Sequence, residues 1–195
     1  AYFPYFSHPD PTVKRKSGFL RPSAFYSEDL GFGASIPYFW APAESYDATF
    51  IATPLSRQGL LMDVELRKTF RSGEMTVRGA GIYQLDPEAF SGHAGDTDWR
   101  GVITTHGAFR INPRWNWGWD AALFSDVTFA DNYAQLWQST STSTLFLTGI
   151  GENNYFDVRG YAYQILSEDY VYSGTTQPPA GSPFTGSGID QQEKQ

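Results

Sequence analysis

The sequence lacks several features that would define a function at once. It contains no cysteine, so neither a disulfide nor a thiolate metal site forms within it. It has no apolar run of about 18 residues, the length that a transmembrane helix requires. Its three histidines (His8, His93 and His106) are too scattered for a zinc site. Its net charge of -7 argues against a nucleic-acid partner, because no basic stripe is available to neutralise phosphates.

Aromatic residues, in contrast, are abundant. Of 195 residues, 17% are aromatic and only 18% are charged. The mean hydropathy of -0.40 is typical of a soluble protein. A transmembrane β-barrel has a similar value, because every second residue of each strand faces a polar lumen. Composition therefore fits a membrane barrel without proving it.

The connections between predicted strands alternate between short and long. The short ones are 71–73, 112–115 and 151–154, and the long ones are 85–98 and 126–139. The strands are about ten residues long, enough to cross a bilayer when tilted. Outer-membrane barrels have short periplasmic turns and longer external loops. The pattern predicts an all-β fold, an antiparallel transmembrane β-barrel segment of the outer-membrane type. A soluble sandwich has the same local alternation but no reason to place its long loops at one end.

Ionisable residues alternate with apolar ones along five predicted strands (60–70, 74–84, 99–112, 115–123 and 155–166). This period of two places the charges on one face of the sheet. A lysine or arginine on the lipid face at mid-bilayer costs about 2–4 kcal/mol. We therefore expect the charged face to line the lumen, and the residues assigned to it are Asp63, Glu65, Arg67, Arg78, Arg100, Arg110 and Arg159.

Aromatic residues cluster near the predicted strand ends. Residues 38–40 and the tryptophans of 115–119 lie beside short turns, whereas Tyr83 and Trp99 flank a long connection. Such belts form where amphipathic rings meet lipid headgroups. Each of these residues is equally compatible with ordinary packing.

The amino-terminal part carries distinctive motifs. They read PYF at 4–6, HPDP at 8–11, KRKSGFL at 14–20 with Pro22 following, IPYFW at 36–40, AP at 41–42, DAT at 47–49, RQG at 57–59 and ELR at 65–67. Together they resemble the LptD family of lipopolysaccharide-assembly proteins, also called organic solvent tolerance proteins. The resemblance covers residues 4–86, and beyond Pro87 only the general barrel pattern is recognisable.

The resemblance implies a two-part protein of the Gram-negative outer membrane. A periplasmic β-jellyroll receives lipopolysaccharide (LPS) through an LptA-type bridge, and a large barrel around an LptE-type lipoprotein plug releases it to the outer leaflet. Residues 1–16 are then the end of the jellyroll and a hinge, with the amino-terminal edge in the periplasm. Residues 17–195 are the first part of the barrel, about nine strands, truncated. The resemblance implies no cofactor and no enzymatic activity.

Two prolines occur in the first predicted strands. Proline has no N–H to donate and is normally confined to sheet edges, so Pro22 and Pro37 each remove a ladder bond. By resemblance these prolines belong to a lateral gate, together with Gly18, Phe19 and Leu20. Through such a gate a lipid with a large polar head leaves the lumen sideways. The alternative is that both prolines mark strand ends or bulges.

A basic run, Lys14, Arg15 and Lys16, falls at the expected hinge. It is a candidate contact for LPS headgroup phosphates, since clustered cations attract anions near a membrane surface. The alternative is a solvated hinge with no ligand.

No catalytic site is predicted. Asp63 with Glu65 and Asp96 with Asp98 are carboxylate pairs, but neither pair is accompanied by the partners that acid–base or metal chemistry requires. His106 lacks a nucleophile motif. Two other functions remain open: a porin-like channel for small solutes, and a soluble sugar-binding sandwich that uses Trp115, Trp117 and Trp119.

Overall fold

The structure, a computed structural model, describes residues 16–133, 142–164 and 166. Lys14 and Arg15, and with them nearly all of the expected jellyroll end, lie outside the described residues. The strands in the described part are β1 (Gly18–Phe19), β2 (Ser23–Ser27), β3 (Gly31–Ala43), β4 (Tyr46–Leu55), β5 (Gly59–Phe70), β6 (Gly73–Tyr83), β7 (Trp99–Asn112), β8 (Trp115–Phe124), β9 (Thr142–Ile150) and β10 (Tyr155–Tyr163).

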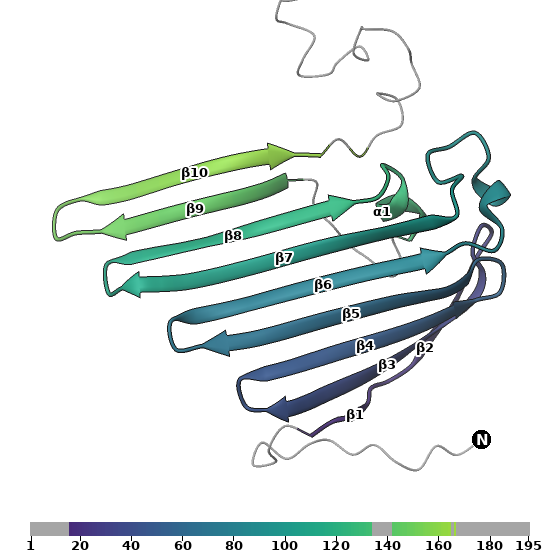
Figure 1. The fold of residues 1–195 in the computed structure, drawn as a ribbon, viewed down its shortest axis with the longest axis horizontal. Helices are drawn as coiled ribbons and strands as arrows, with labels where there is room; N and C mark the ends of the chain where they lie inside the picture. Colours follow the sequence, from purple (N-terminus) through teal and green to yellow (C-terminus); the bar gives the residue numbers. More distant parts are fainter. Residues whose placement is uncertain (1–15, 134–141, 165, 167–195) are drawn as a thin grey trace, which may run out of the picture.

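These strands form one antiparallel sheet in which, from β2 onward, each strand pairs with the next along the chain (Figure 1). The order is β1-β3-β4-β5-β6-β7-β8-β9-β10, and β2 also pairs with β3. The prediction of an all-β antiparallel fold is confirmed. Within the described residues the sheet stays open, with the first strands at one edge and β10 at the other.

The long connections lie at one end of the sheet, where the short turns 28–30 and 56–58 also lie. Short turns join β3 to β4, β5 to β6, β7 to β8 and β9 to β10, at the left of Figure 1. The connection 84–98 with its 3-10 helix η1 (Pro87–Phe90) and the segment after β8 with helix α1 (Phe129–Asn132) lie at the other end. The predicted placement of the long connections at one end is confirmed.

The strand register also confirms the predicted alternation. Cross-strand partners share a face: Glu65 pairs with Arg78, which pairs with Thr104. We call the face that carries these residues the polar face and the opposite one the apolar face. Lys68 is a charged residue on the apolar face, near the short turns, where its Nζ lies 5.2 Å from the centroid of the Phe70 ring.

The buried hydrophobic cluster lies on the polar face, at the end with the long connections. It combines polar-face positions of the strands with residues of the connections: Leu30, Leu55, Leu61, Ala80, Ile82, Phe90, Val102, Phe124, Phe129 and Tyr133. The long connections therefore fold over one end of the polar face. Much of the apolar face, by contrast, is exposed to its surroundings.

None of the helices in the described residues has both the length and the apolar character that crossing a membrane demands.

Candidate functional site

The first strand is interrupted where the sequence places a proline. β1 and β2 both pair with β3, with Phe19 opposite Tyr38 and Ser23 opposite Ser35. Four steps along the first strand thus match three along β3, so one extra residue bulges out. Pro22 lies in this interruption, at 20–22. The expectation that Pro22 sits inside a continuous strand is wrong: it separates two strands, because proline cannot donate to the ladder.

Pro37, in contrast, lies inside β3 as predicted, opposite Ile51 of β4. Its carbonyl accepts a hydrogen bond from the Leu20 N–H at 2.9 Å. In an antiparallel ladder the N–H and C=O of one residue point to the same neighbour. The donor that Pro37 lacks would therefore have faced β1. Both prolines weaken the junction of the first strand with β3.

The strand β1 is held by few contacts. It is two residues long, and Gly18 pairs with Phe39. The ring of Phe19 meets that of Tyr38 edge-on at 5.1 Å, yet Phe19 itself is 77% exposed. The candidate gate residues Gly18, Phe19 and Leu20 thus lie together at the loosest part of the sheet, next to the interruption.

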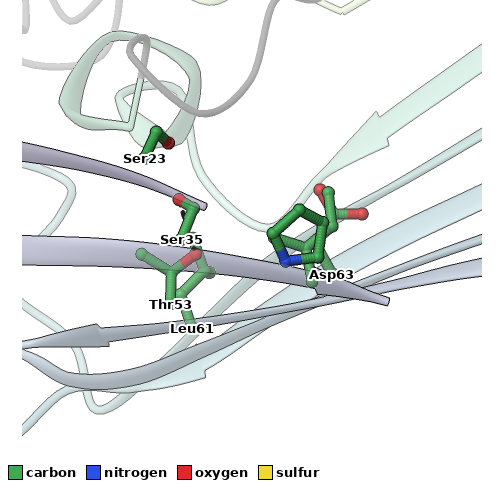
Figure 2. Close-up of a pocket in the computed structure, with 7 residues that line it drawn as sticks. Ser23, Ser35, Thr53, Leu61 and Asp63 are labelled. Carbon is green, nitrogen blue, oxygen red and sulfur yellow. Dashed lines mark hydrogen bonds between the residues drawn. The ribbon is translucent and has the colours of Figure 1, made fainter. Parts of the chain in front are cut away.

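A pocket of about 230 Å³ opens beside the interruption on the polar face. Figure 2 shows Ser23, Ser35 and Thr53 gathered on one side and Asp63 on the other. Ser35 and Thr53 share a hydrogen bond of 3.1 Å between their hydroxyl groups. The remaining lining residues are Pro37, Ile51 and Leu61. The pocket offers hydroxyl groups and a carboxylate over an apolar floor.

The ionisable residues assigned to the lumen share the polar face, and most are paired there. Arg67 contacts Asp47 at 2.7 Å and Glu65 at 3.5 Å. Arg78 binds Asp63 at 2.6 Å. Further along the face, Arg159 contacts Asp157 at 3.0 Å, and Arg110 lies near the short-turn end of β7. The shared face is observed, whereas its facing a lumen stays a prediction.

Arg100 shares that face but is buried rather than open to a lumen, with a side-chain exposure of 0%. Its guanidinium donates to Asp126 (2.7 and 3.0 Å), Thr128 and Asn132. It also lies over the rings of Phe90, Phe129 and Tyr133 at 5.1–5.6 Å. Sequence reasoning missed this role because the partners come from connections without periodicity.

Gln84 links the same cluster to the 84–98 connection. Its amide nitrogen donates to the carbonyls of Gly95 and Thr97, and its amide oxygen accepts from the Tyr133 hydroxyl at 2.9 Å. Arg100 and Gln84 together fasten both long connections to the sheet.

Two titratable groups of this cluster are shifted. Burial raises the pKa of Asp126, but hydrogen bonds from Arg100, Ser125 and Thr128 outweigh it, so the pKa lies below the ordinary 3.8. Burial raises the pKa of Tyr133 from 10.0 to about 12. Both groups thus keep their ordinary forms at neutral pH: an ionised carboxylate and a neutral phenol.

The structure gives less support for a functional role of the other predicted site residues. Lys16 is exposed at the start of the described chain. His106 contacts Asp120 at 2.6 Å, an exposed pair on the polar face. No three metal-ligating side chains gather anywhere in the described ranges.

The comparisons with known proteins agree with the family resemblance of the amino-terminal motifs. The family model described as "LptD: LPS transport system D" matches residues 98–185. This match extends into the part of the chain where the motifs gave only a general barrel pattern.

Several curated relatives are similar over most of the chain. The "LPS-assembly protein LptD" of Nitrosococcus oceani is 32% identical over 161 residues, covering 82% of this chain and 19% of that protein. The protein of the same name from Pseudoalteromonas translucida is 28% identical over 181 residues, 91% of this chain and 23% of that protein. That of Ectopseudomonas mendocina is 39% identical over 87 residues, 45% of this chain and 9% of that protein.

The described part of the chain is an all-β antiparallel sheet, and the family model and the relatives are those of LptD proteins. The chain belongs to the LptD family. It spans 19% and 23% of two of the curated relatives that it matches.

Proposed function

We propose that the intact protein transports LPS to the outer membrane of a Gram-negative bacterium and inserts it into the outer leaflet through a lateral gate at the first strand. The proposal rests on the family and on one observation: the first strand is broken at Pro22 and its neighbour β3 lacks a donor at Pro37, whereas the pairs β4–β5, β5–β6 and β6–β7 show no shift of register. A porin-like channel is not favoured, because the relatives are named as LPS-assembly proteins.

The apolar face supports a place in a bilayer. Tyr83 and Trp99 contact each other at one end of it, at 5.1 Å, and Phe109 stacks on Trp117 toward the other. Phe109 lies ten positions after Trp99 in β7, a distance of about 33 Å along the strand. If the strand is tilted by about 40° from the membrane normal, this length spans about 25 Å of membrane thickness. This height matches the apolar band of outer-membrane barrels, about 25 Å.

The two faces suggest how a lipid with a large polar head is handled. The polar face supplies paired charges and hydroxyl groups for the head, and the apolar face meets lipid. Opening beside β1 lets the head leave the polar face while the acyl chains stay out of water. Gly18, Phe19 and Leu20 are the residues next to that opening, and the pocket of Ser35, Thr53 and Asp63 lies directly behind it.

The proposal also includes the partners that the sequence resemblance implies. Within the proposal, an LptE-type plug occupies the barrel and an LptA-type bridge delivers LPS through a jellyroll that residues 1–16 end. Lys14, Arg15 and Lys16 are then candidate contacts for the headgroup phosphates. No enzymatic step is proposed, since the relatives are named as assembly proteins.

Photocrosslinking of the intact protein to LPS in cells tests the gate. A photoreactive residue at Phe19 or Leu20 is expected to capture LPS, and capture should stop when delivery from the inner membrane is blocked. The matched control is Leu145 of β9, also an exposed apolar side chain. Equal capture at Phe19 and Leu145, or none at either, would contradict the lateral gate.

A further inference from the structure

The first hairpin is formed by β2 and β3, with its tip at the turn 28–30. Several contacts hold this tip, whereas β1 at the other end pairs with β3 through only two residues. At the tip, the β2–β3 turn meets the β4–β5 turn. The Arg57 guanidinium donates to the carbonyl of Glu28 at 2.8 Å, and the Gln58 amide donates to that of Asp29 at 3.2 Å. Backbone N–H groups of Ser56 and Arg57 donate to the carbonyls of Phe32 and Leu30. The turn is thereby tied to β4 and β5.

The same two side chains reach the 84–98 connection. Arg57 binds the Asp86 carboxylate at 2.9 Å, and Gln58 donates to the Asp86 carbonyl at 2.9 Å. Gln58 is fully buried, and Leu30 of the turn belongs to the hydrophobic cluster. Three connections are thus joined at one point through Arg57 and Gln58.

The turn is also shaped for this contact. Gly31 has φ +74°, and a Cβ atom there would lie 2.2 Å from the Ser56 hydroxyl oxygen. Only glycine allows both the left-handed backbone and the close approach. The hairpin therefore has a fixed tip and, beyond the interruption at 20–22, a β1 that pairs with β3 through only two residues.

We propose that Arg57 and Gln58 are positioning residues that hold the tip of the first hairpin still, so that the gate opens by movement of β1 alone. This inference rests on the proposed lateral gate. Opening starts at the short-turn end of the sheet, and the interruption at Pro22 is the hinge. The long-connection end stays closed because Arg57 and Gln58 hold β2, β3 and the 84–98 connection together.

Two cysteine pairs in the intact protein test the direction of opening. Cross-strand partners lie about 4.5–5.5 Å apart at Cα, within the range of a disulfide. One pair, Gly18→Cys with Phe39→Cys, ties β1 to β3, and nothing lies near the Cβ position at Gly18. The other, Tyr26→Cys with Phe32→Cys, ties the tip, where both side chains are exposed. Single-cysteine proteins are the controls.

The expected result is that the β1 disulfide lowers LPS export at least tenfold, whereas the tip disulfide leaves it within twofold of the controls. A block by the tip disulfide, or unchanged export with the β1 disulfide, would overturn the inference. The gate itself is judged separately by LPS crosslinking at Phe19. If crosslinking persists while the disulfides give the opposite pattern, only the hinge proposal fails.

A double variant, Arg57→Ala with Gln58→Ala, tests the two residues directly. The readout is the ratio of LPS crosslinking at Tyr26 to that at Phe19. Release of the tip is expected to raise this ratio at least fivefold, because the opening then extends along β2. An unchanged ratio, including a parallel fall of both signals, would contradict the positioning role.

Discussion

At the residue scale, the most constrained side chain is Arg100. A buried charge is costly unless it is paired and its donors are satisfied. Arg100 meets both conditions through Asp126, Thr128 and Asn132, with aromatic rings on its faces. Its contribution is to hold the two long connections in one arrangement, rather than to add much net stability.

The shifted groups around Arg100 predict how this arrangement depends on pH. The pKa of Asp126 is lowered on folding, so its contribution is present above about pH 4 and is lost as the pH falls below that. The pKa of Tyr133 is raised to about 12, so its contribution is present below pH 10.0 and is lost as the pH rises from there to about 12.

Tyr133→Phe should remove the alkaline part of this dependence. The variant cannot ionise, and it loses the hydrogen bond to Gln84, at a cost of about 1 kcal/mol at neutral pH. Hydrogen exchange of residues 84–98 in the intact protein, compared at pH 9 and pH 11, is the measurement. The unsubstituted protein should lose protection relative to β6, and the variant should change much less. An equal loss in both would show that Tyr133 does not control the transition.

At the element scale, the sequence predicts strands and their faces, but it does not predict contacts between residues far apart in the chain. Alternation placed the strand 99–112 at its observed bounds and put Glu65, Arg78 and Arg110 on one face, because strand periodicity is a local property. The sequence left the interruption at Pro22 only as an alternative, since a single proline is compatible with an edge strand or with a break. The burial of Arg100 was missed, because it depends on contacts between residues far apart in the sequence.

Restoring the missing donor at Pro37 should strengthen the junction of β1 with β3. Pro37→Val allows one more ladder bond, worth about 0.5–1.5 kcal/mol. We expect slower hydrogen exchange at Leu20 and reduced LPS export by the intact protein. Pro54→Val in β4 is the matched control, because Pro54 lies opposite Leu60 of β5 and takes no part in the pairing of the first strand with β3. Faster or unchanged exchange at Leu20 would count against the weakened junction.

At the scale of the whole molecule, the two faces of the sheet should respond oppositely to the same charge. Ile103 and Thr104 are neighbours in β7, on the apolar and the polar face respectively. Ile103→Arg should cost about 2–4 kcal/mol in a bilayer, whereas Thr104→Arg should cost little. The free energy of unfolding of the intact protein in lipid vesicles measures both. Equal costs for the two variants would argue against lipid contact of the apolar face.

From β2 onward, the pairing of each strand with its neighbour along the chain also bears on how the sheet is built. Except for β6–β7 and β8–β9, the hairpins close loops of two to four residues, so the entropy lost in closing each of them is small. A chain arranged in this way can grow strand by strand on a template that already exists. The fastened tip of the first hairpin, tied to β4, β5 and the 84–98 connection, is suited to be that template. The contacts of Arg57 and Gln58 that hold this tip would then also nucleate the assembly of the sheet.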